Sequence, residues 1–426
     1  MSIYSKDPNN KSFCILPFVH THLNTEGDVY PCCVGWNAQR TSKIGDLKDA
    51  SLEELFNSEK MKQLRKDMVA GNRRPEFCDA CYKREDAGFH SARHGNNDDY
   101  LEVEKNIVDS MREDGYLEPI IRSWDIRFSN LCNLKCRTCG DVYSTTWSAE
   151  NLKFDGRATG HLKSIPENFS DPLENQYQNV DKIYFAGGEP LIMAEHFNVL
   201  DNLVSSGRSK EIKLVYNTNM TKLNYENKDL IEYWKSFKEV VLGMSIDGYG
   251  HRAEYIRNGV SWNQIEKNIK KIVDVTREHK NISYHYSVTV SIFNIYSLTD
   301  LHKYFYEAGM MADSGAFLLN ILLGPTYYEI KNLSDSLKNE IKLKIEDHLS
   351  WLTEHKKTNE HGHCYKSYES LISYLEKESC PEDVSKFVIE TEKIDSRRNQ
   401  SFEKTFPEYR EWWNDITSRS IRVKNI

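Results

Sequence analysis

The sequence predicts an α/β protein whose core is a partial (βα)6 parallel barrel. Short apolar runs alternate with amphipathic stretches from about Arg122 to Pro325, which is the pattern of strand–helix–strand units. The helical stretches are long enough to be crossovers, and repeated right-handed crossovers wrap a parallel sheet around itself. We expect six strands, over residues 124–128, 182–186, 212–216, 240–246, 283–290 and 317–323.

Two other parts flank this core. We expect a cysteine-rich unit over 1–95, a helical linker over 96–120, the barrel over 121–330 and a helical extension over 331–426. In the first part, Ser51 and Glu54 form a capping box before a helical stretch, and there is too little apolar alternation for much of a sheet. In the last part, one helical face carries Leu337, Ile341, Ile345, Leu349 and Leu352.

Composition narrows the class of protein. The chain has 426 residues, 39% of them hydrophobic, and a net charge of -8, which describes a globular protein without a general attraction to nucleic acid. The polar amino terminus and the lack of a membrane-length apolar run lead us to expect a cytoplasmic protein without membrane partners. Ten cysteines in that compartment indicate metal ligation before disulfides.

Three cysteines follow the first expected strand with the spacing C-x3-C-x2-C, at Cys132, Cys136 and Cys139. Three thiolates on one short loop can hold three irons of a 4Fe–4S cluster and leave the fourth iron open to a ligand that comes and goes. The alternatives are a structural zinc site and buried free thiols. Zinc normally needs four ligands, and the nearby chain offers no fourth cysteine or histidine at zinc-finger spacing.

This motif, placed after the first strand of an α/β barrel, resembles the radical S-adenosylmethionine (radical SAM) superfamily. The resemblance implies that the amino and carboxylate groups of S-adenosylmethionine chelate the open iron. One electron from the cluster then breaks a carbon–sulfur bond, and the deoxyadenosyl radical abstracts a hydrogen atom from the substrate. The chain departs from the family at Thr138, where an aromatic residue usually precedes the last cysteine.

Further motifs stand at the ends of the second and third expected strands. Gly187, Gly188, Glu189 and Pro190 resemble the family motif that receives the amino group of S-adenosylmethionine, although such a run is also an ordinary turn. Asn217 and Asn219 are similar to a polar turn that faces the ribose in relatives.

The next two strand ends supply the remaining cofactor candidates. By resemblance, Ser245 and Arg257 are suited to grip the cofactor carboxylate, because a guanidinium matches a carboxylate geometrically. Asp247 is a candidate for the ribose or for capping the next turn. Val290 is a candidate to pack on adenine or to be plain core.

Four cysteines of the first part have the form C-x17-C, a long gap, and C-x2-C. Cys14, Cys32, Cys78 and Cys81 resemble the twitch domain, a shortened relative of the SPASM domain, which implies an auxiliary 4Fe–4S cluster with four protein ligands. A zinc knuckle is the alternative. Cys33 is a substitute ligand or a free thiol, while Cys364 and Cys380 are hydrogen-atom donors or structural thiols.

The leading functional hypothesis is a radical SAM enzyme that abstracts a hydrogen atom from a peptide or small-molecule substrate. The expected partner is an electron donor such as flavodoxin or ferredoxin. The alternatives are a non-catalytic iron–sulfur electron-transfer or scaffold protein and a zinc-binding interaction protein. Glu189, Ser245 and Arg257 favour the enzyme, because an electron carrier has no need to bind a methionyl group.

Overall fold

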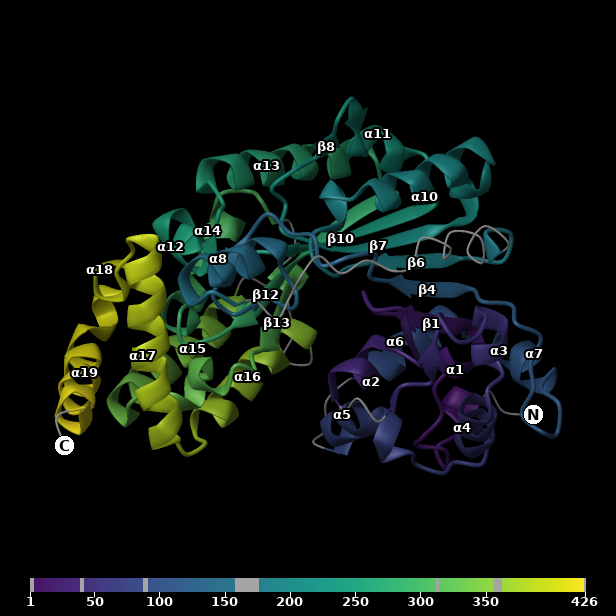
Figure 1. Cartoon of the computed structure of the whole chain (residues 1–426), viewed down its shortest axis with the longest axis horizontal. Coiled ribbons are helices and arrows are strands. Elements are labelled where there is room, and N and C mark those ends of the chain that lie inside the picture. Colours follow the sequence, from purple (N-terminus) through teal and green to yellow (C-terminus); the bar gives the residue numbers. More distant parts are fainter. Residues whose placement is uncertain are drawn as a thin grey trace. The chain divides into compact units, whose positions relative to one another are not determined.

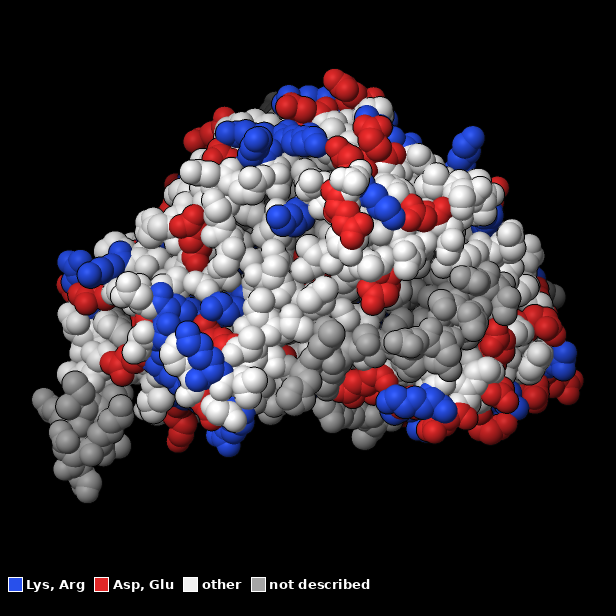
Figure 2. All heavy atoms as spheres, turned by 45° about the horizontal axis from the view of Figure 1, so that its top comes forward, with Lys and Arg blue, Asp and Glu red and all other residues white. Residues whose placement is uncertain are grey.

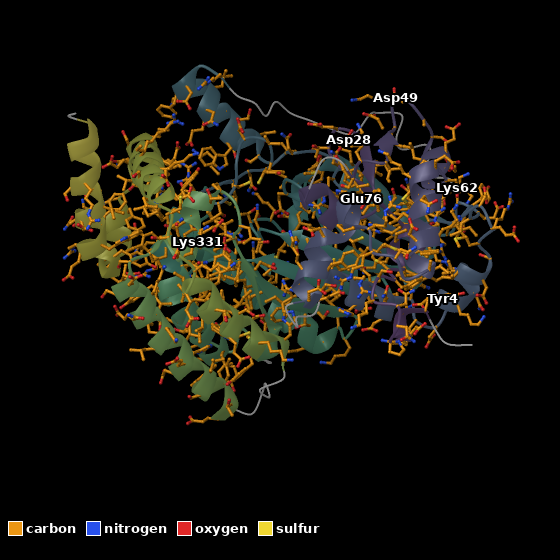
Figure 3. All side chains as sticks on the ribbon, turned by 90° about the horizontal axis from the view of Figure 1, so that it is seen from below. Tyr4, Asp28, Asp49, Lys62, Glu76 and Lys331 are labelled. Atoms are coloured by element: carbon orange, nitrogen blue, oxygen red, sulfur yellow. The ribbon has the colours of Figure 1, made fainter. Side chains whose placement is uncertain are left out.

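The computed structural model describes residues 4–38, 42–86, 91–157, 176–311, 314–354 and 362–424. The chain forms two compact units that interleave along the sequence. Unit 1 comprises Met1–Leu131, Leu162–Tyr216 and Glu232–Val240, and unit 2 comprises Cys132–His161, Asn217–Ile231 and Val241–Ile426. Charged side chains of both signs are spread over the face shown in Figure 2. Among the residues labelled in Figure 3, Asp28, Lys62 and Glu76 belong to unit 1 and Lys331 to unit 2.

Unit 1 contains a sheet whose central strands are parallel. Its strand order is β7–β6–β4–β1–β2–β3. His22, Asp125, Tyr184 and Val215 are paired successively in register across β1, β4, β6 and β7, so they form one row on one face. The strand bounds are β1 His20–Leu23, β2 Asp28–Tyr30, β3 Gly45–Asp46, β4 Ser123–Ile126, β6 Lys182–Phe185 and β7 Lys213–Thr218.

The expectation of little sheet in the amino-terminal part is wrong. β1 pairs in parallel with β4 and continues into an antiparallel hairpin with β2. The reason is that β1 is buried on both faces and pairs polar side chains with polar side chains of β4: His20 Nδ1 lies 2.9 Å from Ser123 Oγ, and His22 Nδ1 lies 3.1 Å from an Asp125 carboxylate oxygen. A strand of this kind has no apolar alternation to reveal it.

Helix α10 (Ala194–Ser205) covers β6 and β7 (Figure 1). Its buried His196 lies 2.9 Å from the Tyr216 hydroxyl and packs edge-on against Phe185. The predicted capping box is present at α3, where the Ser51 hydroxyl and the Glu54 carboxylate each accept a backbone N–H. Other helices of this unit are α1 Leu16–Val19, α2 Cys33–Ala38, α3 Leu52–Phe56, α4 Glu59–Val69, α5 Pro75–Asp86, α6 Ala92–Asp99 and α7 Glu104–Asp109.

Unit 2 contains the other expected strands, in the order β13–β12–β10, with β12 and β13 parallel. Helix α14 packs on β12 through stacked Phe305 and Tyr286 rings, 4.0 Å apart. The bounds are β5 Lys135–Cys136, α8 Thr145–Asp155, β8 Asn224–Tyr225, β9 Lys228–Asp229, α11 Leu230–Lys235, β10 Glu239–Ser245, α12 Gly250–Ile256, β11 Arg257–Asn258, α13 Trp262–Glu278, β12 Ile282–Val290, α14 Leu298–Glu307 and β13 Phe317–Ile321. Three of the elements, β7, α11 and β10, are divided between the two units.

The end of the chain is helical, as the sequence predicts. Leu337, Ile341, Ile345 and Leu352 are buried on one face of α15. The bounds are α15 Asp335–Glu354, α16 His363–Leu375, α17 Pro381–Arg398, α18 Phe402–Thr405 and α19 Arg410–Lys424. Parallel strands joined by helices, followed by this helical region, confirm the predicted α/β class. Within the described ranges, no helix has the length and apolar character needed to cross a membrane.

Candidate active site

The three-cysteine loop lies in unit 2, immediately after unit 1 ends at Leu131. Cys136 belongs to β5, which pairs antiparallel with β11 so that Cys136 is opposite Arg257. The Cys139 N–H donates to the Cys136 carbonyl at 3.1 Å, which turns the loop. Burial, together with the neighbouring Cys136 and Cys132 thiols, raises the pKa of the Cys139 thiol to about 12. The Cys139 thiol therefore lies in a desolvated site near two other thiols, where bound cations would stabilise the thiolates.

In the part of the chain that the structure describes, no three His, Cys, Asp or Glu side chains are grouped closely enough to hold a single metal ion. A cubane spreads its thiolates around a body of several irons and sulfides instead of one ion.

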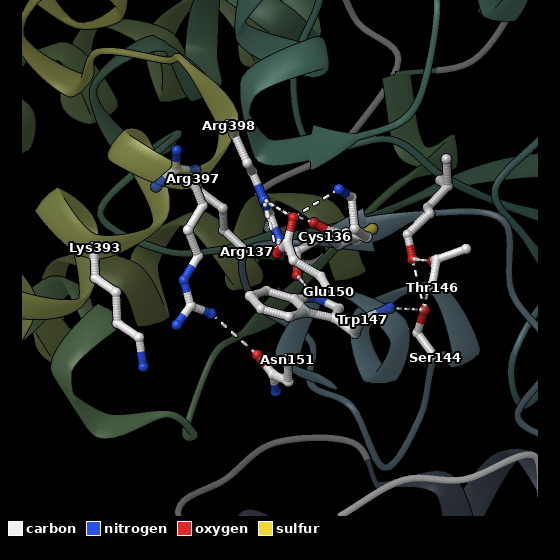
Figure 4. Close-up of polar contacts among 12 residues, drawn as sticks. Cys136, Arg137, Ser144, Thr146, Trp147, Glu150, Asn151, Lys393, Arg397 and Arg398 are labelled. Carbon is white, nitrogen blue, oxygen red and sulfur yellow. Dashed lines mark hydrogen bonds and ion pairs between the residues drawn. The ribbon is translucent and has the colours of Figure 1, made fainter. Parts of the chain in front are cut away.

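The backbone carbonyls of the loop are held by side chains (Figure 4). The Trp147 indole N–H donates to the Cys136 carbonyl at 2.7 Å, and Arg398 donates to the Lys135 carbonyl at 2.9 Å. The Ser144 and Thr146 hydroxyls both donate to the Leu134 carbonyl at 2.7 Å. Each of these carbonyls is fixed by a side chain of unit 2, so the contacts hold the backbone of the loop in a defined conformation.

Helix α17 provides the charged part of this support. The Arg398 side chain, 1% exposed, pairs with Glu150 at 2.8 Å, and Glu150 also pairs with Lys135 at 2.7 Å. Arg137, inside the cysteine motif, pairs with Asp395 of α17 and lies 3.6 Å from the centre of the Tyr255 ring. Sequence reasoning did not connect these residues, because they are far apart in the chain and no local pattern links them.

We expect Arg398→Met to lower the free energy of unfolding by about 3 kcal/mol, because it leaves the buried Glu150 carboxylate without its stronger partner. The measurement is anaerobic urea unfolding of the reconstituted protein. Arg397→Met is the matched control: Arg397 pairs with the partly exposed Asp155, so its loss should cost below about 1 kcal/mol. Equal costs for the two variants would contradict the role given to Arg398.

Arg257 and Asp247 form a buried pair at the strand ends of unit 2. Their Nη2 and Oδ2 atoms are 2.8 Å apart, and Asp247 also accepts the Thr289 N–H at 2.8 Å. Burial raises the pKa of Asp247, which the charge of Arg257 opposes. Arg257 Nη1 lies 3.9 Å from Cys136 Sγ, and its buried Nε has no hydrogen-bond partner among the described residues. That N–H is a donor still to be satisfied beside the cysteine loop.

The other candidates of unit 2 differ in what they contact. The Asn219 amide donates to the Asn133 side chain at 3.0 Å and accepts the Thr221 N–H at 2.9 Å, so it braces the cysteine loop. Asn217 lies half-buried in β7, and Ser245 is the half-buried last residue of β10. Val290 ends β12 and is fully buried.

The Gly-Gly-Glu-Pro turn lies in unit 1, after β6. Gly187 has a φ of 103°, in the left-handed region that favours glycine. A Cβ on Gly188 would lie 2.1 Å from the Leu131 carbonyl oxygen, and the Glu189 N–H donates to that same oxygen at 2.8 Å. The buried Glu189 carboxylate accepts the Leu191 N–H at 3.1 Å, which caps the short helix Pro190–Ile192. The turn therefore packs against the residue before Cys132.

We expect Gly188→Ala to destabilise the protein by about 3 kcal/mol, because its methyl group would overlap backbone that cannot move away cheaply. Gly140→Ala, where a Cβ would meet nothing within 4 Å, should change stability by less than about 0.5 kcal/mol. Denaturant unfolding of both variants checks this. A neutral Gly188→Ala would show that the turn is loosely packed.

The four cysteines of the amino-terminal part line one cavity of about 220 Å³ in unit 1. Burial raises the pKa of Cys14, Cys32, Cys78 and Cys81, and neighbouring thiols contribute to the rise in the first three. The opposite wall includes Asp125, Tyr184 and Val215, the row that crosses the sheet. The cavity thus combines soft thiol ligands with space for a compact inorganic group.

Cys33 lines the same cavity but is directed at a different group. Burial, together with the nearby Asp125 carboxylate, raises the pKa of Cys33 to about 12. Although burial opposes it, Arg127 and His22 hold the pKa of Asp125 well below its usual range. Cys364 is buried in α16, and the Cys380 thiol donates to Glu382 at 3.0 Å.

Two family models match the chain. The model of the radical SAM superfamily matches residues 126–293, which include Cys132, Cys136 and Cys139. The SPASM model, an iron-sulfur cluster-binding domain, matches residues 14–82, which include Cys14, Cys32, Cys78 and Cys81. No curated protein sequence matches the chain.

Solved structures show remote similarity. The structure of histidine-tagged anSMEcpe with bound AdoMet is 19% identical over 54% of this chain and 60% of that chain, with a TM-score of 0.38. Streptococcus suis SuiB bound to S-adenosylmethionine is 14% identical over 78% and 69%, with a TM-score of 0.37. SuiB bound to the precursor peptide SuiA is 16% identical over 82% and 73%, with a TM-score of 0.40. The chain therefore spans about 60% of the length of anSMEcpe.

Proposed function

We propose, from the premise that the chain belongs to the radical SAM superfamily and carries a SPASM domain, that it cleaves S-adenosylmethionine reductively and abstracts a hydrogen atom from a peptide or small-molecule substrate. The observation that carries this proposal is the loop of Cys132, Cys136 and Cys139, in which Cys136 and Cys139 are desolvated and the unsatisfied Arg257 Nε lies beside Cys136.

The radical SAM domain implies a 4Fe–4S cluster and S-adenosylmethionine, and the SPASM domain implies auxiliary iron–sulfur clusters. When bound, the first cluster supplies one electron and an open iron for the cofactor. We assign Cys132, Cys136 and Cys139 to it. We assign Cys14, Cys32, Cys78 and Cys81 to the auxiliary cluster, because they line one cavity.

Arg257 has two roles in this proposal. Its Nη2 neutralises Asp247 in a buried pair, and this pair fixes the guanidinium close to Cys136. Its Nε is then free to donate to an anionic acceptor, which we identify as the carboxylate of the methionyl group. A fixed donor in a desolvated site binds an anion without a reorganisation cost.

The remaining cofactor candidates are assigned more simply. In unit 1, Glu189 is the carboxylate that binds the amino group of S-adenosylmethionine. Gly187 and Gly188 have no side chains, which lets the cofactor approach the backbone of the turn closely. In unit 2, Asn217 and Ser245 offer polar groups at strand ends, while the fully buried Val290 is assigned to the core. Asn219 acts mainly by bracing Asn133.

The test is anaerobic reconstitution followed by three measurements: iron per chain, zinc per chain and deoxyadenosine formed with dithionite and S-adenosylmethionine. We expect about eight irons, from two cubanes, together with deoxyadenosine. Eight irons without deoxyadenosine would instead identify an electron-transfer protein. Zinc in place of iron would identify an interaction module.

A further inference from the structure

An open groove runs beside the three-cysteine loop in unit 2. Its walls include Lys135, Lys153, Phe154, Arg397 and Arg398, and its volume is about 460 Å³. Lys393 stands at its edge, where it pairs with Asp155. We call these residues the cationic groove. Figure 2 shows Lys and Arg side chains gathered on the left of that face, where α8 and α17 lie.

Positive charge exceeds negative charge in this groove, although the whole chain has a net charge of -8. Glu150 is neutralised by Lys135 and Arg398, and Asp155 by Lys393 and Arg397. The exposed Lys153 adds to the excess and lies 5.2 Å from the centre of the Phe154 ring. The groove therefore attracts anionic partners.

A large apolar side chain is exposed among these cations. Phe154 of α8, which lines the groove, is 46% exposed. Exposed apolar side chains rimmed by charge are typical of protein–protein interfaces. A small phosphate-rich ligand would use the cations but would leave Phe154 in water.

Only one layer of protein separates the groove from Cys136. The Arg398 guanidinium lies 4.4 Å from the centre of the Trp147 ring, and the Trp147 N–H donates to the Cys136 carbonyl at 2.7 Å. Arg398 also donates to the Lys135 carbonyl at 2.9 Å. A protein bound in the groove would thus lie against the side chain and backbone that hold the proposed cluster ligand.

We propose that the cationic groove is the docking site of an acidic one-electron carrier protein of the flavodoxin or ferredoxin class. This inference rests on the proposed function, because only a cluster at Cys136 needs an electron at this place. The carrier is oxidised by one electron and the cluster is reduced by the same electron, with no bond or proton exchanged. Complementary charge would speed this encounter and make its rate depend on ionic strength.

The test uses the reconstituted full chain and flavodoxin hydroquinone in anaerobic stopped-flow experiments. The double variant Lys153→Glu with Lys393→Glu should slow cluster reduction by flavodoxin on the order of tenfold at low salt. The difference should shrink at high salt, and reduction by dithionite should be unchanged. Phe154→Ser should slow the flavodoxin reaction at both salt concentrations, because it removes apolar contact instead of charge.

Lys270→Glu with Lys271→Glu on α13 is the matched control, since it makes the same charge change at two half-exposed lysines of unit 2. It should leave the flavodoxin rate unchanged. A wild-type rate for the groove variant at low salt would overturn the proposal, as would an equal loss with dithionite or with the α13 control. Cluster reduction is recorded without S-adenosylmethionine, so failure of cofactor cleavage would be seen separately.

Discussion

Cys132→Ala should abolish deoxyadenosine formation while about four of eight irons per chain remain. The loop cluster has only three protein ligands in our proposal, so the loss of one leaves too few thiolates to hold it. The auxiliary cavity does not include Cys132 and should keep its irons. Iron analysis and product chromatography, after anaerobic reconstitution with dithionite, measure both effects.

Cys380→Ala is the control for that experiment. Cys380 is a half-buried thiol just before α17 that donates to Glu382, and its loss should change neither iron content nor deoxyadenosine. Deoxyadenosine formation by Cys132→Ala at the wild-type rate would remove the central assignment. Loss of all iron would show instead that the two cysteine sets depend on each other.

Cys78→Ala with Cys81→Ala should produce the opposite pattern. The variant should lose about four irons and still cleave S-adenosylmethionine when substrate is absent. Because cluster binding stabilises only the folded state, unit 1 should also unfold at a lower temperature. Iron analysis, deoxyadenosine formation and thermal unfolding followed anaerobically together check this expectation.

The adjacent cysteines Cys32 and Cys33 provide the control for the auxiliary site. Cys33→Ala should retain all the iron, because Cys33 is directed at Asp125, whereas Cys32→Ala should lose the auxiliary cluster. If Cys33→Ala lost iron and Cys32→Ala did not, the ligand would be Cys33.

The sequence predicted the strands of the core closely, and the reason is physical. β6 and β12 bury alternate side chains, and this alternation is visible in the sequence, so 182–186 and 283–290 differ from the structure by a single residue at one end. The capping box at Ser51 was also predictable, because it depends on residues three positions apart. Strand patterns and capping boxes can be predicted because they depend on residues close together in the sequence.

Long-range polar pairing was not predictable in the same way. β1 joins the sheet through His20 and His22, whose partners Ser123 and Asp125 are about a hundred residues away in the chain. The contacts of Arg398 with Glu150 and of Arg137 with Asp395 likewise depend on tertiary structure alone. Trp147 and α17 were therefore absent from the candidate site, although they hold the cysteine loop.

The candidate residues themselves illustrate the limit of a motif. Arg257 lies near Cys136 with an unsatisfied N–H, so the structure supplies a reason for the role that the resemblance implies. The Asn219 side chain instead forms hydrogen bonds with Asn133 and Thr221. A motif identifies which residues to consider, but only tertiary contacts show which atoms are left for a ligand.

Anomalous diffraction at the iron edge, from crystals grown without oxygen, tests the account most directly. It should show two four-iron peaks, one bounded by Cys132, Cys136 and Cys139 with one iron lacking a protein ligand, and one bounded by Cys14, Cys32, Cys78 and Cys81. A zinc signal at the first site with a fourth protein ligand, or sulfurs too far apart to share one cluster, would contradict the proposed chemistry.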